Sequence, residues 1–152
     1  MESLTALNFP ALRVGLISGN PENKIWCPIR KKKYQLTPEE WVRQHVIAYL
    51  LQYKKYPASW ISVEKSSTYN NQKKRWDIAV FQPNGNPFLL VECKAPTVPL
   101  NRDVFEQLYM YQNIVQSTHF ALSNGLEHRI FKQETISMKL KELKDFPEFN
   151  FG

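Results

Sequence analysis

Residues 75–94 read RWDIAVFQPNGNPFLLVECK. Two β-prone runs, 75–81 and 88–94, lie on either side of the segment QPNGNP. The Asn84-Gly85 pair in that segment favours a tight turn between antiparallel strands. The stretch therefore predicts a β-hairpin, and the charged residues on its strands determine which chemistry the fold can support.

Charged side chains are predicted to gather on one face of this hairpin. If the turn is centred on the bond between residues 84 and 85, Asp77 faces Glu92 and Arg75 faces Lys94. Because side chains alternate along a strand, these four residues point to the same face. The opposite face is predicted to be apolar and buried, and it carries Trp76, Ile78, Val80, Leu89, Val91 and Cys93.

The two opposed carboxylates, Asp77 and Glu92, repel each other unless a positive charge lies between them. A hard cation such as Mg²⁺ or Mn²⁺ relieves that repulsion and leaves coordination positions open for water and phosphate. It also lowers the pKa of a bound water, while Lys94 is placed to offset charge that develops in the transition state. The same residues equally allow a surface cluster in which the carboxylates pair with Arg75 and Lys94 and bind no metal.

A helix is predicted to begin at Thr37. Thr37 is a suitable N-cap, Pro38 suits the first helical position, and Glu40 completes a capping box. Apolar residues then recur at helical spacing before Pro57, namely Val42, Val46, Tyr49, Leu50 and Tyr53. The preceding residues 24–36 predict an extended segment with a basic cluster at 30–33.

The rest of the chain predicts a mixed α/β arrangement. A short β-prone run covers 60–63, and the polar residues 66–74 predict a loop that is a candidate for DNA contact. Beyond the first hairpin, the pattern predicts a helix from about 102 to 115. It also predicts a second hairpin that pairs 118–122 with 126–132. Helices in this order can cover a sheet built mostly from adjacent strands.

Composition indicates one globular domain. The chain has 152 residues, of which 43% are hydrophobic and 22% are charged, so we expect a single domain over 1–152 with residues 1–36 packed on it as an N-terminal extension. The net charge of +6 favours contact with a polyanion. We expect a cytoplasmic protein without a membrane partner, because the sequence lacks a long apolar run and a secretory signal pattern. It also lacks the phosphate-binding loop of an ATP-driven motor.

Five segments carry a resemblance to a known family. They are TPEEWVRQ (37–44), RWDIAVF (75–81), LLVECKAP (89–96), QLYMY (107–111) and LSNGLEHRIF (122–131). The aspartate of the second and the E-x-K of the third resemble the signature of the PD-(D/E)XK nucleases. In order and spacing, the five together resemble the N-terminal nuclease domain of type I restriction enzyme R subunits.

This resemblance implies a restriction-endonuclease-like core, with a mixed central sheet flanked by helices in the order helix, three strands, helix, strand. It implies a Mg²⁺- or Mn²⁺-dependent endonuclease that hydrolyses double-stranded DNA. The metal ligands would be Asp77, Glu92 and the carbonyl of Cys93, with Lys94 as a catalytic residue. Further partners would be specificity and methylation subunits and a motor domain absent from this chain. The alternative is an inactive nuclease-like module for DNA binding or subunit docking.

Further site residues follow from the same resemblance. The family often places an acidic residue on the first helix, where this chain has Gln44, so Glu40 one turn earlier is the candidate metal ligand in its place. Gln107 and Tyr111 match a Q-x-x-x-Y motif, which implies that Gln107 orients DNA phosphate or Lys94 and that Tyr111 packs behind it at the DNA. Ordinary packing of one helix face explains the latter pair equally well. Contact with the DNA backbone is expected from the basic residues Arg30 to Lys33 and from Lys73, Lys74 and Arg75.

Overall fold

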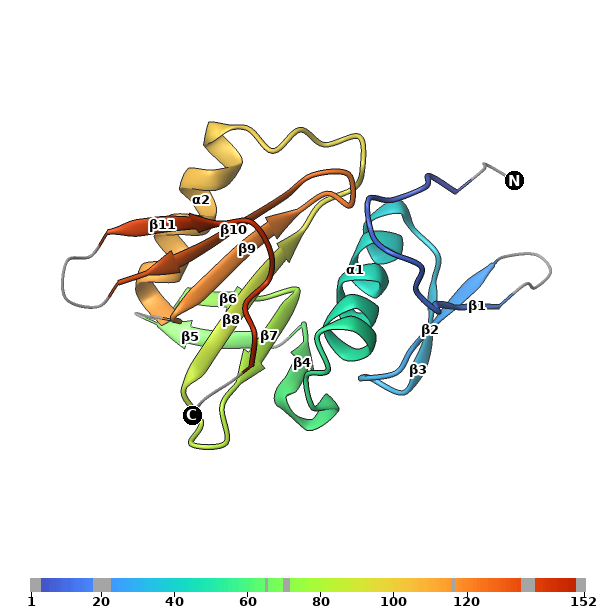
Figure 1. The fold of residues 1–152 in the computed structure, drawn as a ribbon, viewed down its shortest axis with the longest axis horizontal. Coiled ribbons are helices and arrows are strands. Elements are labelled where there is room, and N and C mark those ends of the chain that lie inside the picture. The colour runs from blue at the N-terminus through green and yellow to red at the C-terminus, as the bar shows by residue number, and fades with distance from the viewer. Residues whose placement is uncertain are drawn as a thin grey trace.

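The computed structural model describes residues 4–17, 23–64, 66–69, 72–115, 117–134 and 139–149. For residues 66–69, 72–74 and 111–115 it describes the backbone alone. Its centre is a six-stranded sheet in the order β11-β10-β9-β8-β7-β4, with helices on both faces (Figure 1). The predicted α/β class is therefore confirmed.

The central sheet is mixed. Its strands are β4 (Ile61–Val63), β7 (Ile78–Phe81), β8 (Pro87–Cys93), β9 (His119–Ser123), β10 (His128–Gln133) and β11 (Leu140–Leu143). Neighbouring strands run antiparallel except β8 and β9, which are parallel. The helix α2 (Arg102–Val115) connects these two parallel strands, as a parallel pair requires.

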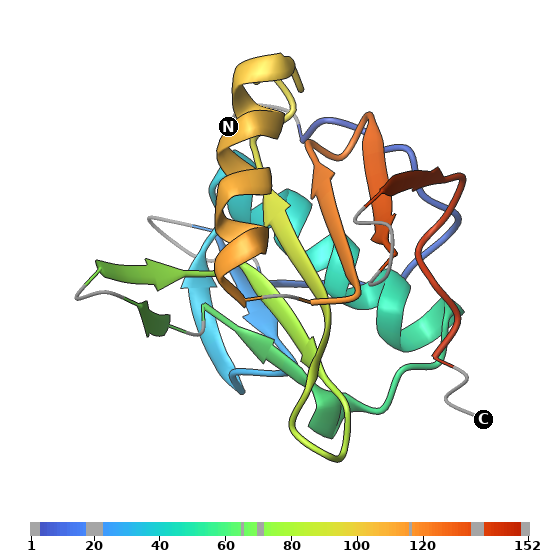
Figure 2. The same cartoon turned by 90° about the vertical axis from the view of Figure 1, so that its left-hand side faces the viewer.

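Two helices lie on opposite faces of this sheet (Figures 1 and 2). The first, α1 (Pro38–Ala48), continues into a π-helical turn, η1 (Tyr49–Tyr53), and a 3-10 turn, η2 (Ala58–Trp60), precedes β4. Apolar side chains of α1 form one buried cluster with the alternate sheet residues Ile78, Val80, Leu89, Val91 and Cys93. On the other face, Leu108 of α2 packs with Ala79, Leu90, Phe120 and Leu122.

The predicted hairpin is confirmed, and its register is confirmed for residues 78–80, whereas a shift after Val80 pairs Phe81 with Pro87. Ile78 pairs with Val91, and Val80 pairs with Leu89, which is the register of a turn centred between residues 84 and 85. Gly85 has a φ of +88°, the left-handed conformation that glycine adopts without strain. The bounds of α2 and the second hairpin, β9 with β10, also follow the prediction.

The strand predicted over 75–81 is wrong at its start. β7 begins at Ile78, and Trp76 and Asp77 form a break between it and a separate strand. Trp76 consequently packs in the cluster on the α2 face, and not with Ile78 and Val80 as predicted. The loop predicted over 66–74 is also wrong, because β5 (Ser66–Tyr69) and β6 (Gln72–Arg75) pair as a hairpin that projects from the sheet (Figure 2).

A three-stranded antiparallel sheet lies beside α1 (Figure 1). It consists of β1 (Gly15–Ile17), β2 (Lys24–Cys27) and β3 (Lys32–Gln35), so residues 24–36 form a hairpin and not a single extended segment. Its Ile25 and Cys27 are fully buried, and Trp41 of α1 donates a hydrogen bond to the Thr5 carbonyl at 2.8 Å. The N-terminal residues thus pack on α1, while the single-domain organisation stays a prediction.

Two smaller features differ from the sequence patterns. Tyr53, predicted on the buried face of the first helix, is 60% exposed, because the π-helical turn breaks the helical spacing after Ala48. The edge strand β11 had no clear signal in the sequence. Among the described residues, no helix has the length and apolar character needed to cross a membrane.

Candidate active site

The break before β7 and the end of β8 bring the predicted residues together. Asp77 directly precedes β7, while Glu92 and Cys93 end β8 and Lys94 follows them. Asp77 is buried, and Glu92 and Lys94 are half-buried. The side chains of Asp77 and Glu92 interact, and this interaction helps to lower the pKa of Asp77. The predicted proximity of these two carboxyls is therefore present, and their catalytic role stays a prediction.

Both carboxylate oxygens of Asp77 have fixed partners. Oδ2 accepts a hydrogen bond from the backbone N–H of Cys93 at 2.7 Å, and Oδ1 accepts one from Nη2 of Arg43 at 2.8 Å. Burial raises the pKa of Asp77, but its hydrogen bonds with Glu92 and Cys93 and the charge of Arg43 outweigh burial and lower that pKa below its ordinary value. Asp77 is therefore an oriented, ionised carboxylate at neutral pH.

Arg43 connects Asp77 to a second buried carboxylate. Its Nη1 donates to Oε1 of Glu40 at 2.8 Å. Glu40 also accepts from Nη2 of Arg30, at 2.9 Å on Oε1 and 2.8 Å on Oε2, and from Nε2 of Gln44 at 3.0 Å on Oε2. Each Glu40 oxygen thus has two donors, which occupy both of its lone pairs.

These contacts bear on the predicted role of Glu40. The N-cap is confirmed, because the Glu40 N–H donates to Oγ1 of Thr37 at 3.1 Å. The Glu40 carboxylate, however, faces Arg30, Arg43 and Gln44, and no lone pair remains for a cation. This arrangement does not support Glu40 as a metal ligand, and its assignment stays a prediction.

Sequence reasoning missed three residues of the site: Arg43, Glu39 and Glu64. Glu39 lies in the first turn of α1, and burial and the charge of Asp77 raise its pKa, whereas Arg43 and Lys94 act to lower it. Its carboxylate therefore shares the electrostatic environment of Asp77 and Lys94. The available signal was spacing, because Arg43 lies four residues after Glu39 on one helix face.

Glu64 closes the site from the sheet edge. It adopts a positive φ of 57°, and its N–H donates to the carbonyl of Asp77 at 3.1 Å. Its carboxylate lies 3.2 Å from Nη1 of Arg30 and 3.5 Å from both Nη1 of Arg43 and Nη2 of Arg75. Glu64 thereby contacts three arginines, of which Arg43 also contacts Asp77.

The predicted DNA-contacting residues lie on two elements. Arg75 ends β6 with its side chain 64% exposed, so it remains accessible to a polyanion. Lys73 and Lys74 also lie on β6 and Tyr111 lies on α2, but their side chains are outside the described residues. Gln107 occupies an exposed position on α2. The roles of these residues stay predictions.

The donor set around Asp77 is compatible with a divalent cation. The thiol of Cys93 is fully buried, and burial together with the charge of Asp77 raises its pKa well above the ordinary value, so it remains protonated. Across the described part of the chain, no group of three or more His, Cys, Asp or Glu side chains could hold a metal. Mg²⁺ nevertheless commonly binds through one or two carboxylates, and the contact between Asp77 and Glu92 supplies two.

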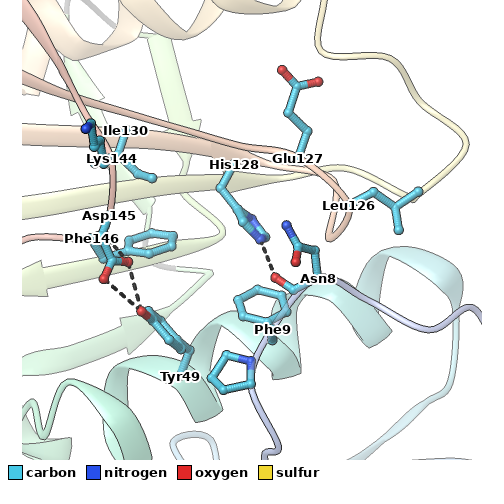
Figure 3. Close-up of a pocket in the computed structure, with 11 residues that line it drawn as sticks. Asn8, Phe9, Tyr49, Leu126, Glu127, His128, Ile130, Lys144, Asp145 and Phe146 are labelled. Carbon is cyan, nitrogen blue, oxygen red and sulfur yellow. Dashed lines mark hydrogen bonds between the residues drawn. The ribbon is translucent and has the colours of Figure 1, made fainter.

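A cavity of about 380 Å³ lies elsewhere in the molecule (Figure 3). Two pairs of its polar groups are joined to each other: Tyr49 donates to Asp145 at 2.8 Å, and Nε2 of His128 lies 2.9 Å from the Asn8 carbonyl. None of the predicted site residues lines it. The cavity marks where the N-terminal segment packs against β10 and the C-terminal segment, apart from Asp77.

A family of known proteins matches most of this chain. A family model described as the Type I restriction enzyme R protein N terminus (HSDR_N) matches residues 38–147. A solved fragment described as an HsdR subunit of a type I restriction enzyme from Vibrio vulnificus YJ016 is 22% identical, with a TM-score of 0.38. That match covers 57% of this chain and 16% of the Vibrio chain, and no curated protein matches. Since the family model spans well over half of its residues, this chain belongs to the family of type I restriction enzyme R protein N termini.

Proposed function

We propose that this chain is a nuclease domain with a restriction-endonuclease-like core that hydrolyses phosphodiester bonds of double-stranded DNA with Mg²⁺ or Mn²⁺. The observation that carries the proposal is the contact between the Asp77 and Glu92 carboxyls, with Lys94 directly beyond the end of β8. Two acidic groups in contact must share a proton or a cation. A site that faces DNA phosphate is suited to a cation.

Asp77 and Glu92 would hold the cation, together with the backbone carbonyl of Cys93. When bound, it would polarise the scissile phosphate and lower the pKa of a coordinated water. Arg43 and the Cys93 N–H each use one lone pair on a different Asp77 oxygen, and Glu92 also interacts with this carboxylate. The cation would take the place of the proton between Asp77 and Glu92, so the two nitrogen donors would leave each Asp77 oxygen a lone pair for it. Asp77 therefore supplies an ionised carboxylate of fixed orientation without losing its capacity to bind metal.

Lys94 would stabilise the transition state. Its backbone N–H donates to the Ser123 carbonyl at 2.8 Å, which fixes the main chain where β8 ends. Its ammonium lies near enough to Glu39 to act on the pKa of that carboxyl. A cation there offsets negative charge that builds up on the phosphate oxygens as water attacks phosphorus and the 3′ oxygen leaves. Cleavage would leave 5′-phosphate and 3′-hydroxyl ends.

The wider partners are proposed from the family. A type I R protein N terminus would act on DNA brought to it by a motor, with specificity and methylation subunits selecting the DNA. The chain spans 16% of the Vibrio chain that it matches, so these partners would contribute through parts outside this sequence. Arg75 at 64% exposure is the described residue best placed to contact the DNA backbone beside Asp77.

A second candidate function is an inactive nuclease-like module that binds DNA or another subunit. Two observations favour it. Gln44 stands where the family often has a helix carboxylate, and the nearby Glu40 carboxylate is fully occupied by Arg30, Arg43 and Gln44. Such a module would bind DNA equally well when divalent ions are removed.

Plasmid cleavage separates the two functions. The parent protein is incubated with supercoiled plasmid and Mg²⁺ or Mn²⁺, beside Lys94→Ala and a matched control, Lys141→Ala, on the exposed surface of β11. The nuclease hypothesis predicts cleavage by the parent and the control, loss with chelator, and a rate reduced by about 100-fold or more in Lys94→Ala. Chelator-insensitive DNA binding without cleavage by the parent would support the inactive module.

A further inference from the structure

An arginine outside the family match is part of the charge network at the candidate site. Arg30 lies in the turn between β2 and β3, whereas the family match begins at residue 38. It belongs to the basic cluster 30–33, but its side chain is only 11% exposed. Lys31, Lys32 and Lys33 beside it are exposed, so Arg30 alone among the four points into the protein.

The turn fixes this inward orientation. Lys31 donates its N–H to the Cys27 carbonyl at 2.8 Å and has a left-handed φ of 55°. The N–H of Arg30 donates to Sγ of Cys27 at 3.4 Å. Its guanidinium lies over the ring of Tyr34, 3.5 Å from the centroid, which holds the planar group against one side.

From Arg30, charges alternate in sign to Asp77. Arg30 contacts Glu40 at 2.8 Å, Glu40 contacts Arg43 at 2.8 Å, and Arg43 contacts Asp77 at 2.8 Å. The four side chains are at most 11% exposed. Because water hardly reaches these side chains, each charge is compensated mainly by its neighbours in the series. Removing the charge of Arg30 therefore changes how the charge of Glu40 is compensated.

Arg43 has no other fixed partner of comparable burial. The Nε atoms of Arg30 and Arg43 are buried without a hydrogen-bond partner among the described residues. Both guanidinium groups are therefore held by the carboxylates that their Nη atoms contact. Without Arg30, Glu40 would retain Arg43 as its one cation in this series and draw it away from Asp77.

We propose that Arg30 is a positioning residue for Asp77 that acts through Glu40 and Arg43. Its effect on catalysis rests on the proposed function, in which Asp77 holds the cation. The N-terminal sheet then contributes to the active site itself, although it lies outside the residues that the family model matches.

Arginine side-chain NMR tests this relay, the series of contacts from Arg30 through Glu40 and Arg43 to Asp77, without any metal or DNA. In the parent, the two ion pairs of Arg43 should block rotation of its guanidinium and give separate signals for Nη1 and Nη2. In Arg30→Gln, these signals should merge or broaden, and Arg30→Lys should restore part of the separation because it keeps a charge opposite Glu40. Unchanged Arg43 signals in folded Arg30→Gln would overturn the proposal.

A double-mutant cycle tests the route. Arg30→Gln should lower kcat for DNA cleavage by about tenfold, while KM for DNA changes by less than about twofold because Arg30 touches no substrate. In a Glu40→Gln background, the same change should alter kcat by less than about twofold. An equal loss of kcat in both backgrounds would overturn the proposed route. The control Arg129→Gln removes an arginine from an exposed pair with Glu142, and a loss of kcat in this control equal to that in Arg30→Gln would also overturn it.

The two arms distinguish failure of the relay from failure of the proposed function. A parent that neither binds Mn²⁺ nor cleaves DNA contradicts the nuclease function, and the NMR comparison then decides the relay alone. If Arg30→Gln does not fold, Arg30→Lys replaces it in the NMR comparison and in the double-mutant cycle. Arg30→Lys should then lower kcat in the parent background and leave kcat unchanged in the Glu40→Gln background.

Discussion

Replacement of Arg43 by methionine tests whether the buried charges are balanced as the contacts indicate. The Arg43 side chain is 8% exposed and lies 2.8 Å from both Glu40 and Asp77, which are 7% and 10% exposed. Arg43→Met keeps much of the side-chain volume but removes the charge. Glu40 retains Arg30 and Gln44, whereas Asp77 retains the Cys93 N–H and its bond with Glu92.

We expect this substitution to lower the free energy of unfolding by about 3 to 5 kcal/mol at pH 7, the cost of leaving a buried charge uncompensated. The loss should depend on pH. Because the folded-state pKa of Asp77 is below its ordinary value of 3.8, ionised Asp77 stabilises the parent above that pH and ceases to do so as the pH falls through the lowered pKa. The difference between parent and variant should therefore be full at pH 7 and shrink only below pH 3.8, as the pH falls through the lowered pKa of Asp77.

Urea unfolding, followed by tryptophan fluorescence and circular dichroism at several pH values, measures this difference. Arg129→Met is the matched control, because its ion pair with Glu142 is 39% and 47% exposed and should contribute less than about 1 kcal/mol. A loss in Arg43→Met no larger than in Arg129→Met, or one that stays the same as the pH falls well below 3.8, would refute the balanced network.

Three other predictions follow from the contacts. Glu39→Gln should raise the unfolding midpoint at pH 7, and this gain in stability should vanish as the pH falls through the raised Glu39 pKa. The same substitution should weaken Mn²⁺ binding. Scanning calorimetry at two pH values measures the stability, and titration calorimetry measures the binding. In urea unfolding, Gly125→Ala should lower the free energy of unfolding by about 1 to 3 kcal/mol more than Gly85→Ala does. Both glycines have a positive φ, but only at residue 125 would an added Cβ meet another side chain, that of Leu7 at 2.7 Å. Lys94→Ala should abolish most cleavage with an unchanged unfolding midpoint, since its half-buried side chain is expected to act on the phosphate.

The central hairpin could be predicted because its determinants are local. Asn84-Gly85 specifies the turn, and the apolar runs 78–81 and 88–91 on either side of it specify two strands that are buried on both faces. A turn centred between residues 84 and 85 sets the register, which the pairing of Ile78 with Val91 confirms. The proximity of Asp77 and Glu92 follows from that register, so the part of the site on this hairpin was accessible from sequence.

The break at Asp77 could not be predicted, because residues 75–81 contain no glycine or proline that would signal the end of a strand. The contacts that accompany the break are long-range. Glu64 donates to the Asp77 carbonyl at 3.1 Å, and Arg43 of α1 binds the Asp77 side chain. The edge strand β11 was missed for a similar reason, since its pairing with β10 compensates for a sequence that has only 4 residues, half of them charged.

The arginines of the site were missed because arginine in a helix or a basic turn is usually exposed. Arg30 was grouped with three lysines that are exposed, and only the fold shows that its guanidinium reaches Glu40. Spacing within one helix relates Glu39, Glu40 and Arg43 to each other, but not to Asp77, which lies 34 residues beyond Arg43. Contacts across such distances depend on packing that periodicity does not encode.

Binding of Mn²⁺ tests the central claim most directly, because it requires neither DNA nor a motor. Isothermal titration and electron paramagnetic resonance would be applied to the parent, to Asp77→Asn and Glu92→Gln, and to Glu142→Gln as an exposed control. We predict that the parent and the control bind Mn²⁺ and that each site variant weakens binding by about tenfold or more. A parent that binds no Mn²⁺, or one whose affinity is unchanged when Asp77 or Glu92 is replaced, would contradict the account.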